Sequence, residues 1–148
     1  MTTSTRPPKF RKAVGLIAAA AMSADGDVDP AEVARYLMAC EDLGIPEEEA
    51  DRNLVAGFAR LDSGEAASAV ILEAASSVPR KLRPLCYELM VHVVGADRIL
   101  AKEELDVLAD VADALELSRA FTLGHMARFV RTNPDVRVPS VKVIGTMS

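Results

Sequence analysis

Apolar residues recur every three or four positions along most of this chain, the spacing that places them on one face of an α-helix. The pattern predicts seven helices, which begin near residues 10, 30, 46, 64, 84, 102 and 119. Alternating apolar positions, which are typical of a strand, appear only after residue 134, as Val136, Val138, Val141 and Val143, with Pro139 between them. We therefore expect an all-α domain followed by an extended C-terminal tail.

Side chains that cap helices mark several of the predicted starts. Asp29 precedes Pro30 and is followed three positions later by Glu32, which is the arrangement of a capping box. In the same way, Ser63 is expected to cap the fourth helix and Ser118 the seventh. The helical spacing predicts that the third helix buries Leu54, Val55, Phe58 and Leu61.

One motif occurs twice in the chain. Residues 24–32 return 72 positions later as residues 96–104, with Ala, Asp and Glu at matching places. Each copy follows an apolar helix and opens an amphipathic one, which ends at Leu-Gly-Ile (43–45) or Leu-Glu-Leu (115–117). The repeat predicts that 10–43 and 84–115 form equivalent hairpins, so that the fold has two pseudo-equivalent halves.

The two motifs bring carboxylates together at helix ends. Calcium and magnesium ions prefer oxygen ligands of this kind, whereas zinc prefers nitrogen and sulfur. The motifs therefore predict a divalent-cation site, with calcium or magnesium favoured over zinc, and its candidate ligands are Asp25, Asp27, Asp29, Glu32, Asp97 and Glu104. A working EF-hand loop is excluded, because its first and third ligand positions would be Ala21 and Ser23.

Helix capping is the alternative explanation for these carboxylates. It accounts fully for Asp29 and Glu32. In the second copy, Ala101 cannot cap through its side chain, yet Glu104 keeps its place at the head of an apolar stripe. A carboxylate in that position needs a cation, a backbone amine or a basic residue as its partner.

Few residues suggest catalysis. Glu88 and His92 lie four positions apart and could act with Asp97 as an acid/base group, but a solvated pair on a helix surface is the simpler interpretation. His125 has no companion in the sequence. Because nucleophile, phosphate-loop and dinucleotide motifs are missing from the sequence, we expect a protein that is not an enzyme.

Charge is divided unevenly along the chain. Residues 25–116 hold 21 acidic and 8 basic side chains, a net charge of −13, whereas residues 1–24 and 117–148 each carry a net charge of +4. An acidic body argues against nucleic-acid binding. The basic ends fit attraction to anionic lipid or another acidic surface, and they fit equally well a purely solubilising role.

Two features of the sequence bear on the cellular compartment of the protein. Cys40 and Cys86 stand alone, which fits small core residues in a reducing cytoplasm. Residues 6–21 also have the pattern of a secretory signal, and the protein would be secreted if residues 1–21 were one. The repeat instead equates residues 13–24 with the interior helix 85–96, which favours a cytoplasmic protein. No apolar run in the sequence approaches the roughly 20 residues that span a bilayer.

At the two motifs the chain resembles the tellurite-resistance TerB family. The residues that carry the resemblance are 21–32 and 93–105, together with the Leu-Gly-Ile end of the second helix, and the similarity covers about residues 10–130. It implies a non-enzymatic fold of seven helices in two halves, metal binding, a role in stress responses and partnership with membrane proteins on the cytoplasmic side. By position it implicates Asp25, Glu32, Asp97 and Glu104, while Arg98 and Ala101 depart from the pattern.

We therefore divide the chain into a basic arm (1–9), a TerB-like helical domain (10–132) and a Val-rich tail (133–148). The leading hypothesis is a binding or scaffold protein in a stress-response or membrane-associated complex, with a protein partner or a second copy of itself. The alternatives are an accessory subunit that docks through residues 134–145 and, less favoured, a hydrolytic enzyme.

Overall fold

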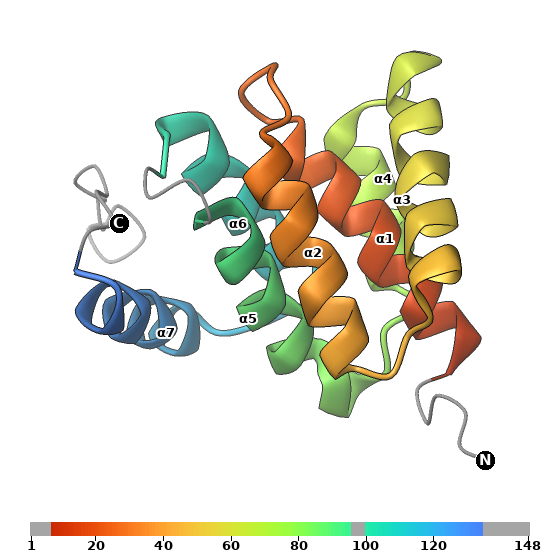
Figure 1. Cartoon of the computed structure of the whole chain (residues 1–148). Coiled ribbons are helices and arrows are strands. Elements are labelled where there is room, and N and C mark those ends of the chain that lie inside the picture. The colour runs from red at the N-terminus through yellow and green to blue at the C-terminus, as the bar shows by residue number, and fades with distance from the viewer. Residues whose placement is uncertain (1–6, 96–99, 135–148) are drawn as a thin grey trace.

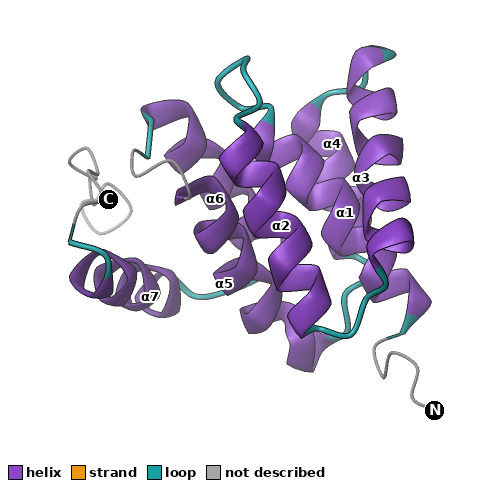
Figure 2. Ribbon diagram, viewed as in Figure 1, coloured by secondary structure: helices purple, strands orange, loops and turns teal. Residues whose placement is uncertain are grey.

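The computed structural model describes residues 7–95 and 100–134. Figure 2 shows only helices and loops along these residues, which agrees with the predicted all-α class. They form seven α-helices and one 3-10 turn, namely α1 (Pro8–Met22), α2 (Pro30–Asp42), α3 (Glu47–Asp62), α4 (Ala67–Ala75), η1 (Arg80–Leu82), α5 (Arg83–Val94), α6 (Lys102–Ala114) and α7 (Arg119–Thr132). None of the helices in this part of the chain is long and apolar enough to cross a bilayer.

Helix α1 is the centre of the core. Every residue from Ala13 to Met22 is buried, and the helix contacts α3, α4, α5 and α6. Figure 1 shows α1 enclosed by the other helices, with α3 and α4 along one side. The run of alanines explains this position, because side chains of one methyl group let neighbouring backbones approach closely on all sides. The segment with the pattern of a secretory signal therefore forms the core helix.

The repeat seen in the sequence extends through three helices in each half. The α2 bounds, moved by 72 positions, coincide with those of α6, and the end of α1 coincides with the end of α5. The start of α3 falls on the start of α7 in the same register. The predicted pseudo-equivalent halves are therefore confirmed, and they comprise α1–α2–α3 and α5–α6–α7 rather than two hairpins alone.

The turns after α2 and α6 have the same geometry. The N–H of Ile45 donates to the carbonyl of Cys40, and the N–H of Leu117 donates to the carbonyl of Ala112. Between them lies a residue with positive φ, Gly44 (80°) in the first half and Glu116 (60°) in the second. A left-handed residue at this place ends a helix and satisfies its last carbonyls.

Two predictions about α3 and α4 are wrong. Ser63 ends α3 rather than starting α4, and its hydroxyl donates to the carbonyl of Arg60 (2.8 Å). Val55 is 55% exposed, because α3 turns Ala50, Asn53, Leu54 and Gly57 toward the core instead. A short polar residue fits the C-terminal end of a helix as well as its start, so the sequence signal was ambiguous.

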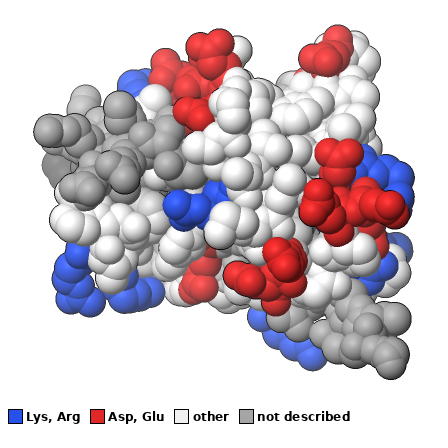
Figure 3. All heavy atoms as spheres, in the orientation of Figure 1, with Lys and Arg blue, Asp and Glu red and all other residues white. Residues whose placement is uncertain are grey.

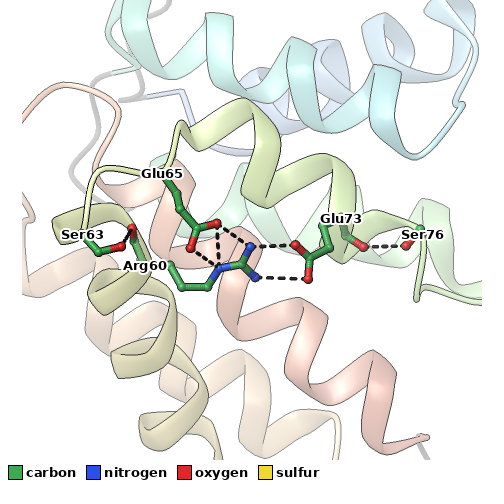
Figure 4. Close-up of polar contacts among 5 residues, drawn as sticks. All are labelled: Arg60, Ser63, Glu65, Glu73 and Ser76. Atoms are coloured by element: carbon green, nitrogen blue, oxygen red, sulfur yellow. Dashed lines mark hydrogen bonds and ion pairs between the residues drawn. The ribbon is translucent and has the colours of Figure 1, made fainter.

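A network of charged side chains holds the corner between α3 and α4. Figure 4 shows the guanidinium of Arg60 between Glu65 and Glu73, with N–O distances of 2.6 and 2.7 Å. The hydroxyl of Ser76 donates to the carbonyl of Glu73 at the end of α4 (2.6 Å). Because water screens these charges, the network contributes little to stability.

Candidate functional site

The first acidic motif is a helix-capping structure. The carboxylate of Asp29 accepts a hydrogen bond from the N–H of Ala31 (2.8 Å). The carboxylate of Glu32 reaches back and accepts from the N–H of Asp29 (3.1 Å). These contacts satisfy backbone donors that the start of a helix otherwise leaves without a partner. The predicted capping box is therefore confirmed.

The second motif repeats half of this arrangement. Glu104 accepts a hydrogen bond from the N–H of Ala101 (2.9 Å), as Glu32 does from Asp29. Glu32 and Glu104 are each 1% exposed, at the same step of the repeat. Each buried carboxylate therefore has a backbone N–H as a partner, which is one of the kinds of partner predicted for Glu104.

The remaining carboxylates of the first loop face outward. Asp25 and Asp27 are exposed, and Asp25 accepts a hydrogen bond from the N–H of Asp27 (3.1 Å) across Gly26, which has φ of 90°. Asp97 lies outside the described residues. Within the described ranges, no three His, Cys, Asp or Glu side chains come close enough to hold a metal ion together. Cation binding by the predicted ligands stays a prediction.

A cluster of rings joins α5 to α7, and it contains the residues first considered for acid/base chemistry. The prediction that His125 has no companion is wrong: its Nδ1 lies 4.0 Å from an Oε of Glu88, and its ring packs edge-on against Tyr87 (5.9 Å between centroids). His92 packs edge-on against Phe129 (5.2 Å). The cluster could not be predicted from the sequence, because α6 separates α5 from α7 along the chain.

Both imidazoles are held toward their neutral form. Burial lowers the pKa of His125, and Glu88 opposes this while Arg128 adds to it. His92 is more exposed, and partial burial lowers its pKa as well. His125 and Arg35 lower the pKa of His92 further, and Glu88 raises it. A neutral imidazole can act as a base, but His125 is only 9% exposed, which leaves little access for a substrate.

The cysteines behave as core residues, as the sequence indicates. Cys40 and Cys86 are both free thiols and both buried. Burial raises the pKa of Cys40 to about 11 and that of Cys86 to about 12. Thiols with such values remain protonated near neutral pH and are poor nucleophiles and poor metal ligands.

The surface between α2 and α5 is hollowed. A hollow of about 370 Å³ lies between the two helices, with Leu43, Leu85 and Leu89 among its lining residues. A second hollow, of about 420 Å³, lies between the end of α2 and the start of α3, around Ile45 and Pro46. Met38 lines both hollows and is 60% exposed. Large apolar side chains exposed at a hollow are typical of binding surfaces.

Comparison with known families assigns the fold. The family model described as tellurite resistance protein TerB matches residues 11–122, about three quarters of the chain. The chain belongs to the TerB family. The TerB match begins in α1 and ends in the first turn of α7, so it includes both acidic motifs and the hollow between α2 and α5. The resemblance stated from the two motifs is thereby confirmed.

Two further comparisons add no relatives to this TerB chain. Neither the search of curated proteins nor the search of solved structures found a match. The ring cluster between α5 and α7 lies partly beyond the TerB match, because His125 and Phe129 follow residue 122.

Proposed function

We propose that this TerB-family chain is a non-catalytic binding protein, and that the two hollows beside Met38 take an apolar protein segment that carries basic residues. The observation that carries the proposal is Met38 itself, a large apolar side chain that is 60% exposed between two hollows. Burying such a side chain against a partner is favourable by about 25 cal/mol per Å² of apolar surface.

The charges around the hollows determine the kind of segment. Glu41 and Glu47 border one hollow, and Asp42 and Glu88 border the other. Arg35 is the only Lys or Arg among the residues that line the two. Figure 3 shows acidic side chains gathered at both ends of α2. An apolar segment with Lys or Arg would therefore meet complementary charge.

Basic segments of this kind lie beside the membrane helices of many membrane proteins on the cytoplasmic side. The proposal therefore includes a cytoplasmic location and a complex with a membrane protein, in a stress response related to tellurite resistance.

Binding of model peptides tests this proposal. A short fluorescent peptide of alternating leucine and lysine should bind the wild-type chain, and a leucine–glutamate peptide of the same length should not. Met38→Lys should weaken binding on the order of tenfold, as expected when a central interface contact is removed. Leu72→Lys is the matched control, because Leu72 is 63% exposed on α4. Equal affinity of the two variants would refute the proposed surface.

A divalent cation at the loop before α2 is a second candidate function. It is supported by Asp25 and Asp27, whose exposed carboxylates lie two positions apart beside the turn at Gly26. Isothermal titration with calcium, magnesium, manganese and zinc should give heat with wild type and none with Asp25→Asn/Asp27→Asn. Glu103→Gln, an exposed acid on α6, is the control. Absence of heat from the wild-type chain would leave capping as the role of this motif.

Docking through residues 134–145 is the other assembly hypothesis, and it falls outside the described residues except for Pro134. A chain ending at residue 133 should bind the basic peptide as wild type does if the hollows are the binding surface. Loss of peptide binding on this truncation would favour the tail as the docking element.

A further inference from the structure

Helix α7 is attached to the rest of the molecule through aromatic rings. Figure 1 shows it as the outermost helix, on the far side of α5 from α1. Phe129 is 3% exposed and fits against Gly95, where an added Cβ would lie 2.6 Å from the ring. Tyr87 on α5 packs edge-on against both Phe121 and His125 on α7, with 6.2 and 5.9 Å between centroids. Docking of α7 therefore depends on how well these rings fit together.

His125 places a titratable ring at this contact, and burial lowers its pKa. It is 9% exposed, and its Nε2 has no hydrogen-bond partner in the described part of the chain. A neutral imidazole tolerates this because the free nitrogen is only an acceptor. Protonation turns that nitrogen into a charged donor without an acceptor, which is strongly unfavourable inside an apolar contact.

The charged groups around the two imidazoles do not offset this penalty. Glu88 on α5 is the nearest acid, but it lies 4.0 Å from Nδ1, on the opposite side of the ring from Nε2. Arg128 on α7 faces His125, and Arg35 on α2 faces His92. The two imidazoles also face each other, with 6.3 Å between ring centroids. Protonating both would place like charges side by side.

We propose that the α5–α7 contact is a pH-dependent latch, closed when His92 and His125 are neutral and released when they are protonated. Release would uncover the rings of Tyr87 and Phe129 and open the hollow between α6 and α7, which Leu108 and Met126 line. The latch would thus expose an apolar surface under acid stress. This inference goes beyond the proposed function, although Glu88 and His92 also line the hollow between α2 and α5.

The pH range follows from the direction of the pKa changes. In the released helix the imidazoles have their ordinary pKa near 6.5. In the docked helix the pKa of each is lower. The docked state is therefore fully favoured above about pH 6.5, and it weakens as the pH falls below that value until the docked pKa is passed. The docking equilibrium changes about tenfold for each unit by which docking lowers a pKa.

Hydrogen exchange of the full-length chain tests the latch. Amide protection, corrected for the intrinsic rate, is measured from about pH 8 to about pH 5 in α7 and in α3. We expect protection in α7 to fall on the order of tenfold, and protection in α3 to stay constant. His92→Phe/His125→Phe removes both histidines of the chain and should hold α7 protection constant.

Three outcomes would overturn the latch: constant α7 protection in the wild type, the same fall in the variant without histidines, or a parallel fall in α3, which would mean global unfolding. If phenylalanine does not fit at position 125, His125→Asn serves in its place, because Asn53 occupies the corresponding position of the first half.

Discussion

The contact between α1 and α3 in the first half corresponds to the contact between α5 and α7 in the second half. The two contacts are formed by different kinds of residue. In the first half, Gly15 lies against Asn53 and Gly57 against Ala19, so closely that an added Cβ would meet its neighbour at 2.4 and 2.6 Å. In the second half, the corresponding positions of Gly15, Asn53 and Gly57 are Tyr87, His125 and Phe129, which pack as rings.

The two contacts differ in how far the outer helix, α3 or α7, can move against its neighbour. In the first half the backbones of α1 and α3 are in direct contact, and neither glycine can be enlarged without moving its neighbours. This contact leaves α3 no room to shift. In the second half, rings fill the space between α5 and α7, and two of them are imidazoles, whose charge depends on pH. The first half therefore provides the central helix of the core, and the second half provides a helix whose docking responds to pH.

The largest effect is expected from enlarging a glycine in the contact between α1 and α3. Gly15→Ala places a methyl group 2.4 Å from the Cβ of Asn53 and 2.8 Å from its backbone carbon, so the free energy of unfolding should fall by about 3 kcal/mol. Gly124→Ala in α7 is the matched control. Its new methyl group meets only the end of Arg128 at 3.6 Å, and it should stabilise the chain by about 0.5 kcal/mol. Denaturant unfolding measures both, and equal effects would show that the contact between α1 and α3 tolerates an added methyl group.

An intermediate effect is expected at the left-handed residue that ends α2 and α6. Gly44→Ala forces a Cβ onto φ of 80° and should lower the free energy of unfolding by about 1.5 kcal/mol. Glu116→Gly relieves the same strain in the second half but removes an ion pair to Arg83 (3.0 Å), so it should stay within about 0.5 kcal/mol of wild type. Thermal unfolding at constant pH compares the two, and a large loss in Glu116→Gly would mean that the ion pair outweighs the strain.

The smallest effect is expected at the capping positions, where one half lacks what the other has. Asp29→Ala removes the cap on Ala31 and should lower the free energy of unfolding by about 1 kcal/mol. Ala101→Asp restores the missing cap at the start of α6 and should raise it by about 0.5 kcal/mol, since Ala101 already has an extended backbone (φ −69°, ψ 161°). Chemical denaturation of both variants against wild type measures the pair. A loss of stability in Ala101→Asp would show that the two helix starts are not equivalent in their environment.

Local signals in the sequence predicted the helices and most of their ends. The capping box at Asp29 and Glu32 and the cap at Ser118 are confirmed, because such residues bond to backbone only a few positions away. The assignment of Ser63 was wrong because a short polar residue fits either end of a helix. The burial of Val55 was wrong because it depends on how α3 lies against α1. The side of a helix that faces the core is decided by its closest neighbour, here through Gly15 and Gly57.

The candidate sites divide in the same way. Equivalent glutamates at the starts of α2 and α6 were readable from the repeat, since each bonds within its own motif. The ring cluster was not, because Glu88, His92 and His125 come from two helices that meet only after α6 has returned the chain. The hollow beside Met38 could not be predicted from the sequence either, because it depends on the space between α2 and α5.

The all-α class, the duplication and the capped starts of α2 and α7 follow from the sequence alone, since each depends on residues close in the chain whose spacing matches a helical turn. Only the folded structure shows that glycines form the contact between α1 and α3, whereas imidazole and aromatic rings form the contact between α5 and α7. The reason is physical: a helix pattern states which residues are apolar, but the distance between two helices depends on the side chains of both, and these meet only in the folded chain.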